Sequence, residues 1–278
     1  MPSTPTASAE PGAGPAEDWY LRRAVLTRCN LAPGAIASQR FQDDPQRLEI
    51  AWVRSEHQAF LDLVALLPDA EERGHFFHEH QLSRFWLHED PAHWPSRAER
   101  QRASYAAVLR GWGFDSDGPS GAVLKGWAEH RFGLRPIWHR TVLSTCDQAR
   151  ERYASQRMHG ATTGIGMQLD LLYTFCQDEL ARRHPGQRWL TLYRGTHDAE
   201  SYVVKRSVGR EELVEFNTVS SFTADRETAW AFGSCVWEVR VPLAKVVYFT
   251  GLVPSGLLQG EAEYIVLGGD YAARVLSH

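Results

Sequence analysis

Residues 184–196 read His-Pro-Gly-Gln-Arg-Trp-Leu-Thr-Leu-Tyr-Arg-Gly-Thr, and this stretch divides the chain into two parts of different character. Between residues 19 and 185, apolar residues recur at helical spacing. Between residues 186 and 278, short segments rich in Val, Tyr, Phe, Trp and Thr are separated by Gly and Pro turns, which is typical of strands. Because helices and strands are segregated along the chain, we predict an α+β fold in which a helical N-terminal part packs on a β-rich C-terminal core.

The helical part contains several apolar stripes. The clearest follows a capping box formed by Ser96 and Glu99, and it predicts a helix that ends near Gly113. The stripe residues of this helix are Tyr105, Val108, Leu109 and Trp112, and three further stripes comprise Ile50, Val53, Phe60, Leu63 and Leu67, then Val123, Leu124, Trp127 and Arg131, then Leu169, Leu172, Tyr173, Cys176 and Leu180. We interpret the aromatic residues of these stripes first as core residues.

The C-terminal part is predicted to be mostly strand. One short helix, at residues 225–232, is expected to interrupt the strands. The predicted strands span residues 189–193, 213–219, 235–241, 246–250, 264–267 and 272–276.

Composition excludes several classes of protein. The chain has 30 basic and 34 acidic residues and a formal net charge of -4, so it offers no basic field for nucleic acid. No apolar run approaches the roughly 18 residues that a membrane-spanning helix needs. Residues 1–18 contain no aromatic residue and almost nothing to bury, so we expect a disordered arm there. That arm also lacks the pattern of a signal peptide, and we therefore expect a cytoplasmic protein.

Three familiar kinds of site are poorly supported. Gly164 and Gly166 follow no strand and lack the third glycine of a dinucleotide fingerprint, whose place is taken by Leu169. The cysteines are scattered and no G-x-S-x-G motif occurs, so zinc, disulfides and a nucleophilic triad are disfavoured. The histidines of residues 75–93 include no H-E-x-x-H pair, and we expect them to face water between buried aromatic residues rather than to bind metal; they are His75, His78, His80, His88 and His93.

A more specific constellation lies in the C-terminal part, in three pieces. The first is an arginine at the end of a predicted strand, Arg194 in residues 192–196. The second is a strand that runs into a hydroxyl-rich turn, residues 216–223. The third is a pair of glutamates, Glu261 and Glu263, at the start of an apolar strand.

The order of these pieces resembles the R-S-E class of mono-ADP-ribosyltransferases. Together with the blocks at residues 109–116 and 121–127, they are similar to the dinitrogenase reductase ADP-ribosyltransferase family of nitrogen-fixing bacteria. This second resemblance covers roughly residues 20–278. It implies an NAD-binding catalytic core at residues 186–278 and a helical region at residues 19–185 that docks the target or a regulator.

The residue types fit the binding of NAD. The planar guanidinium fork of Arg194 matches a diphosphate, and Gly195 lets the backbone approach the nicotinamide amide. The resemblance places Ser221 and Thr223 at the two hydroxyl positions of the family's S-T-S motif, with Ser221 bonded to the nicotinamide ribose or to Glu263. Ser220 remains an alternative, because the register can slip by one. The same resemblance places Phe232 against the nicotinamide, and core packing is an equal alternative for that ring. A helix cap or turn is an equal alternative for Thr223.

The two glutamates are expected to carry the chemistry. Two residues apart on a strand, their side chains share one face, with their backbones about 6 to 7 Å apart. Breaking the bond between ribose and nicotinamide develops positive charge on the sugar, which a carboxylate stabilises. The resemblance assigns this role to Glu263, bonded to the ribose 2′-hydroxyl, and assigns to Glu261 the orientation and deprotonation of an acceptor arginine.

The sequence therefore predicts an enzyme that moves ADP-ribose from NAD to an arginine. The resemblance implies dinitrogenase reductase, the nitrogenase iron protein, as the target, inactivation of nitrogen fixation as the outcome, and regulation by a PII-type signalling protein. The mechanism requires no metal. The alternatives are a transferase or NAD glycohydrolase with another acceptor, and a binding module that senses NAD without turnover.

Overall fold

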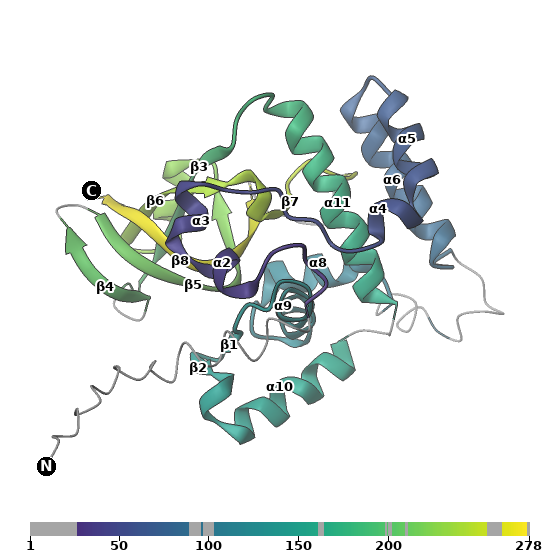
Figure 1. The fold of residues 1–278 in the computed structure, drawn as a ribbon. Helices are drawn as coiled ribbons and strands as arrows, with labels where there is room; N and C mark the ends of the chain where they lie inside the picture. The colour runs from purple at the N-terminus through teal and green to yellow at the C-terminus, as the bar shows by residue number, and fades with distance from the viewer. Residues whose placement is uncertain are drawn as a thin grey trace, which may run out of the picture.

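The computed structural model describes residues 27–88, 96, 103–160, 164–197, 199, 202–208, 211–254 and 263–276, with Ser144 and the strand residues 203–208 described by their backbone alone. The predicted arm at 1–18, the capping residue Glu99, His93 and Glu261 lie outside these residues. Within them, helices dominate up to residue 183 and strands dominate from residue 189 onward, so the predicted α+β class is confirmed (Figure 1).

Several helices begin or end at residues that suit a helix terminus. The Asp69 carboxylate caps α6, and Asp225 caps the short α12 in the same way. Pro119 starts α9, and Gly133 ends it in the left-handed conformation. The helices are α2 (Pro33–Ala37), α3 (Gln39–Asp43), α4 (Val53–Glu56), α5 (Gln58–Leu66), α6 (Ala70–Arg84), α8 (Tyr105–Phe114), α9 (Pro119–Phe132), α10 (Asp147–Gly160), α11 (Ile165–Arg183) and α12 (Arg226–Trp230), with 3-10 turns η1 (Leu143–Thr145) and η3 (Leu243–Lys245).

The predicted start of α8 is wrong. This helix begins at Tyr105, and its cap is Ser104, whose hydroxyl accepts a hydrogen bond from the backbone N–H of Ala106. Ser96, described as non-helical, lies eight residues before this cap. The predicted end near Gly113 and the buried face of the helix are confirmed.

Two of the three further stripes are confirmed, and one is wrong in part. The apolar stripe residues of α9 and all those of α11 are buried. The stripe before residue 67 breaks at His57, where α4 ends and α5 begins. Within α5 the buried face comprises Phe60, Leu61 and Val64, so Leu63 points away from the core and is 55% exposed.

The strands form a six-stranded antiparallel sheet that closes on itself. Its order is β4-β5-β3-β6-β8-β7, and an additional pairing of β5 with β8 completes a ring of four strands, which makes the sheet barrel-like. A separate two-stranded ribbon precedes it. The strands are β1 (Ile137–Trp138), β2 (Thr141–Val142), β3 (Trp189–Thr196), β4 (Val203–Val208), β5 (Glu211–Thr223), β6 (Cys235–Pro242), β7 (Val246–Phe249) and β8 (Glu263–Leu276).

The last two predicted strands are one. Gly268 and Gly269 separate them in the sequence, yet both glycines lie inside β8. The partner strand β5 shifts register between Phe216 and Val219, opposite these glycines. A Cβ on Gly268 would lie 1.8 Å from the Asn217 carbonyl oxygen, so glycine is required where the irregular strand approaches.

Helices cover the sheet on more than one side (Figure 1). The Gln42 side chain of α3 accepts a hydrogen bond from Ala272 N and donates to the carbonyls of Arg240 and Ala272, which ties α3 to β6 and β8. Across the sheet's β7 edge, Tyr173 of α11 donates to the Ala244 carbonyl, and Gln177 donates to the Val246 carbonyl. One hydrophobic core therefore draws on both parts of the chain.

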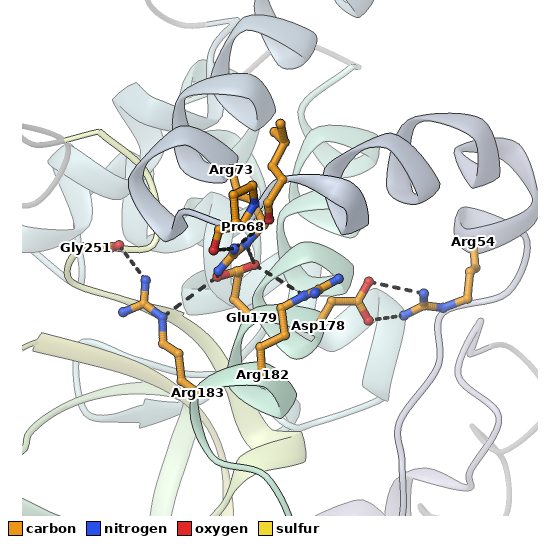
Figure 2. Close-up of polar contacts among 9 residues, drawn as sticks. Arg54, Pro68, Arg73, Asp178, Glu179, Arg182, Arg183 and Gly251 are labelled. Atoms are coloured by element: carbon orange, nitrogen blue, oxygen red, sulfur yellow. Dashed lines mark hydrogen bonds and ion pairs between the residues drawn. The ribbon is translucent and has the colours of Figure 1, made fainter.

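A buried cluster of charges joins α6, α11 and the chain after β7 (Figure 2). The Glu179 side chain is 1% exposed, and its two oxygens accept hydrogen bonds from Arg73 at 2.6 and 2.9 Å. Arg183 approaches the same carboxylate at 3.9 Å and donates to the Gly251 carbonyl. The segment that leads toward the glutamate pair is therefore anchored to the helical part.

The expectation that the histidines of α6 face water is wrong for two of them. His78 shares a hydrogen bond with the Tyr105 hydroxyl, and His80 stacks on Phe60 with ring centroids 3.8 Å apart. Burial lowers the pKa of both rings, so they stay neutral at pH 7. His75 is exposed beside Glu71. Among the described residues, no group of three metal-ligating side chains occurs.

None of the helices that the structure describes combines the length and the apolar character needed to cross a bilayer.

Candidate active site

Three strands bring the predicted site residues to one edge of the sheet. Tyr193, within β3, lies opposite Thr223 at the end of β5, and Thr223 lies opposite Glu263 at the start of β8. Because the strands are antiparallel, pieces that are about 70 residues apart in sequence become neighbours. The register thus explains why an arginine, a serine and a glutamate from separate motifs meet.

A cavity of about 650 Å³ opens at this edge. It is lined by Arg110, Trp112, Gly113, Phe114, Ser116, Tyr193, Arg194, Gly195, Thr196, His197, Ser221, Phe222, Thr223, Thr228, Ala229, Phe232 and Glu263. Six of the eight predicted site residues are among them. Ser220 does not line the cavity, and Glu261 lies outside the described residues. Its predicted position on the same strand face as Glu263 stays a prediction.

Ser221 stands at the centre of the polar contacts. Its hydroxyl donates to Glu263 Oε1 at 2.6 Å, and its backbone carbonyl accepts a hydrogen bond from Arg194 Nη1 at 2.6 Å. Successive side chains on a strand point to opposite faces, so the neighbouring Ser220 is buried on the other side, where its hydroxyl lies 3.5 Å from the Asn217 carbonyl. Of the two serines that the sequence left open, Ser221 is the one in the cavity.

Glu263 is held at both its backbone and its side chain. Its backbone N–H donates to the Thr250 hydroxyl at 3.1 Å, and its carbonyl accepts from Thr250 N at 2.9 Å. The Ser221 hydroxyl fixes one carboxylate oxygen. The residue lines a cavity that is large enough for a nucleotide fragment.

Arg194 presents a cation to the same cavity. Its guanidinium carbon lies 5.8 Å from the ring centroid of Tyr202 and 5.9 Å from those of Phe216 and Phe222. Among the described residues it makes no ion pair, and its Nε is buried without a hydrogen-bond partner. A planar donor fork that is held by aromatic faces and has no carboxylate partner among the described residues is suited to an anionic ligand.

The structure defines the surroundings of three predicted residues, which the sequence did not reveal or left open. A Cβ on Gly195 would lie 1.9 Å from the Ala229 carbonyl oxygen, so glycine is needed for β3 to pass α12. The Thr223 hydroxyl accepts from Asp225 N and shapes the turn into α12, whose cap is Asp225. Phe232 is 65% exposed, so its ring is not a core residue.

The end of α8 forms a wall of the cavity that sequence reasoning missed. Arg110, Trp112 and Phe114 come from this helix, and Ser116 follows it. Trp112 was interpreted only as a core residue, yet its indole N–H donates to Ser221 Oγ at 2.9 Å. The signal in the sequence that points to these residues is the block at 109–116, which is part of the resemblance to the family.

The cavity therefore combines a fixed carboxylate, a cationic fork and exposed aromatic rings. Burial, with Glu238 beside it, raises the pKa of the Tyr193 phenol, so that group stays a neutral hydrogen-bonding partner at pH 7. Such a site can bind a phosphate ester at its cation and stabilise positive charge at its carboxylate. A second hollow, of about 470 Å³ and lined in part by Cys29, Trp52 and Arg54, contains none of the predicted site residues.

Comparison with known proteins places the chain in a family. The family model described as dinitrogenase reductase ADP-ribosyltransferase matches residues 26–275. The chain is also similar to the NAD(+)–dinitrogen-reductase ADP-D-ribosyltransferase of Rhodospirillum rubrum, with 39% identity over 248 residues, which cover 86% of this chain and 90% of that protein. A comparison with solved structures gave no match. The chain belongs to the dinitrogenase reductase ADP-ribosyltransferase family.

Proposed function

We propose that this protein transfers ADP-ribose from NAD to an arginine of dinitrogenase reductase, releases nicotinamide and thereby inactivates nitrogen fixation. The observation that carries the proposal is the Ser221–Glu263 hydrogen bond beside Arg194, inside one cavity. The name of the relative from Rhodospirillum rubrum supports both the donor and the protein substrate.

NAD binding is assigned to groups on β3, on β5 and in the turn that follows α12. The Arg194 fork takes the diphosphate, because its guanidinium has donors free of any described carboxylate. The Phe232 ring, exposed in the cavity wall, packs against the nicotinamide. Ser221 and Thr223 offer hydroxyls at the same edge of the sheet, and Gly195 leaves the strand end without a side chain.

The reaction exchanges one bond to the ribose for another. The bond from ribose C1′ to the nicotinamide nitrogen breaks, and its electron pair leaves with nicotinamide. Glu263 accepts a hydrogen bond from the ribose 2′-hydroxyl and stabilises the positive charge that develops on the sugar. A guanidinium nitrogen of the acceptor then bonds to C1′, and its proton passes to Glu261. The products are ADP-ribosylarginine, nicotinamide and one proton.

The finer features of the function rest on the family resemblance and on the E-x-E pattern. Arginine is proposed as the acceptor because the family resemblance associates it with a glutamate two residues before the catalytic one, the place of Glu261 before Glu263. Regulation by a PII-type signalling protein and a cytoplasmic location are proposed with the target protein. The mechanism as written needs no metal, and the net charge of -4 offers nothing to nucleic acid.

Incubation of the purified protein with NAD labelled on the ADP-ribose tests the proposal. One reaction contains dinitrogenase reductase, a second contains an arginine analogue and a third contains buffer alone. We expect label on an arginine of the reductase. Label only on the analogue, or free ADP-ribose in all three reactions with no label on the reductase, contradicts the proposed substrate and leaves a transferase with another acceptor or an NAD glycohydrolase. Absence of any turnover contradicts catalysis.

A further inference from the structure

A hydrogen-bond chain enters the cavity from the helical part of the molecule. The indole N–H of Trp112 donates to Ser221 Oγ at 2.9 Å, and the same oxygen donates its proton to Glu263 Oε1 at 2.6 Å. The chain thus joins α8, β5 and β8, three elements that are far apart in the sequence.

The chemistry of the three groups fixes the direction of donation along this chain of hydrogen bonds. An indole N–H can only donate, an ionised carboxylate can only accept, and a serine hydroxyl has one proton and two lone pairs. Because Trp112 occupies a lone pair of Ser221, the hydroxyl proton is left to the carboxylate. Without the indole donor, the hydroxyl can rotate among other acceptors and lose its bond to Glu263.

The donor is also fixed in space. Trp112 is 4% exposed and belongs to the hydrophobic core. The turn between α8 and α9 is tightly packed, since a Cβ on Gly121 would lie 2.0 Å from the Ser116 carbonyl oxygen. Lys125 of α9 is bonded to Asp117 within the same turn. The indole therefore cannot follow Ser221 if the hydroxyl turns.

We propose that Trp112 is a positioning residue, which acts through Ser221 to keep the Glu263 carboxylate oriented for the ribose of NAD. This inference rests on the proposed function. Trp112 donates its one polar hydrogen to Ser221, so its loss acts on the rate after NAD is bound. The bond from Arg194 to the Ser221 carbonyl does not involve the indole, so we expect Arg194 to keep its place and its proposed role in binding the diphosphate.

A double-mutant cycle tests this coupling. The variants are Trp112→Phe, which removes the indole donor and keeps an aromatic ring, Ser221→Ala, and the two together. We expect Trp112→Phe to lower kcat about 10-fold, or about 1.4 kcal/mol, with KM for NAD changed less than about 2-fold. In the Ser221→Ala background the same change should have little further effect, because the hydrogen-bond chain from Trp112 to Glu263 is already broken.

Trp127→Phe is the matched control. Trp127 is equally buried, and its indole N–H donates at 2.7 Å to Asp170, outside the cavity. This variant reports what a lost buried indole bond does to stability alone, and its kcat effect should add to that of Ser221→Ala. An equal drop in kcat for Trp112→Phe with and without Ser221, or an unchanged kcat in folded Trp112→Phe, overturns the proposal.

A second measurement needs neither turnover nor a folded Trp112 variant. In nitrogen-15 spectra of the protein, Glu263→Gln should shift the indole N–H resonance of Trp112, which touches Ser221 rather than Glu263, and should leave that of Trp127 in place. An unmoved Trp112 resonance contradicts the proposed coupling of Trp112 to Glu263 through Ser221. Because the spectra are recorded without substrate, this test is independent of the proposed function. The proposed function fails if wild-type protein does not label dinitrogenase reductase.

Discussion

At the scale of single residues, Ser221 makes the contacts that join the three motifs. Its hydroxyl bonds to Glu263 and accepts from Trp112, while its carbonyl accepts from Arg194. One residue thus fixes the carboxylate of Glu263 and contacts the guanidinium of Arg194.

The buried Lys245 is a second residue with an unusual environment: its ammonium donates to the Gly268 carbonyl and lies 4.4 Å from the Tyr271 ring centroid.

Lys245 should make stability depend on pH. Burial lowers its pKa from 10.5 to about 7, a shift that disfavours the charged form by about 5 kcal/mol at roughly 1.4 kcal/mol per pKa unit. Below about pH 7 both folded and unfolded states carry the proton, and the folded state bears the full penalty. Between about pH 7 and 10.5 only the unfolded state keeps it, so folding becomes more favourable as pH rises.

We therefore expect the free energy of unfolding of wild-type protein to rise relative to that of Lys245→Met between pH 7 and pH 9.5. At pH 7 the methionine variant should be the more stable of the two. Urea unfolding of both proteins at the two pH values measures this difference. A difference that stays constant with pH would show that Lys245 is charged throughout.

At the scale of elements, periodicity predicted the helices and strands with long regular patterns. The stripe of α11 and the strand β6 agree closely with prediction, because each repeats one period over its whole length. The exceptions are strands whose course depends on the strand with which they pair. Strand β8 continues through Gly268 and Gly269 because β5 shifts register beside them, and β4 was missed because its pairing with β5 is irregular. Single-sequence patterns contain neither fact.

The charge cluster of Figure 2 makes the packing of α6 on α11 sensitive to one carboxylate. Glu179→Gln leaves the buried Arg73 without its counter-charge, and we expect a loss of about 3 to 5 kcal/mol in the free energy of unfolding. Asp178→Asn, which breaks the half-exposed pair with Arg54, should cost only about 0 to 1 kcal/mol. Chemical unfolding of the two variants compares them directly, and equal losses would contradict this assignment of burial.

At the scale of the whole molecule, the helical part supplies a wall of the cavity as well as core. The order of the motifs was enough to predict a shared site, and six of the predicted residues do meet in this cavity. The wall from α8 could not be predicted in the same way, since the approach of Trp112 to Ser221 depends on how two distant segments pack. The choice between Ser220 and Ser221 likewise needed the strand register, which the sequence alone did not define.

Substitution of Glu261 should affect transfer to a protein substrate more than hydrolysis of NAD. Glu261→Gln removes the proposed base for the incoming guanidinium, whereas water can still attack the sugar cation. We expect label transfer to dinitrogenase reductase to fall at least about 10-fold more than the slow release of free ADP-ribose from NAD. Both rates are measured in one reaction by chromatography. Parallel losses would assign Glu261 to the step that Glu263 is proposed to assist.

The most direct measurement is the rate at which folded Glu263→Gln transfers label from NAD to dinitrogenase reductase. The side chain keeps its size and its place beside Ser221 but loses its negative charge. The account predicts a rate about 100- to 1000-fold below that of wild type, the scale expected when one preorganised electrostatic group is removed. A rate equal to wild type, with native circular dichroism, would contradict it.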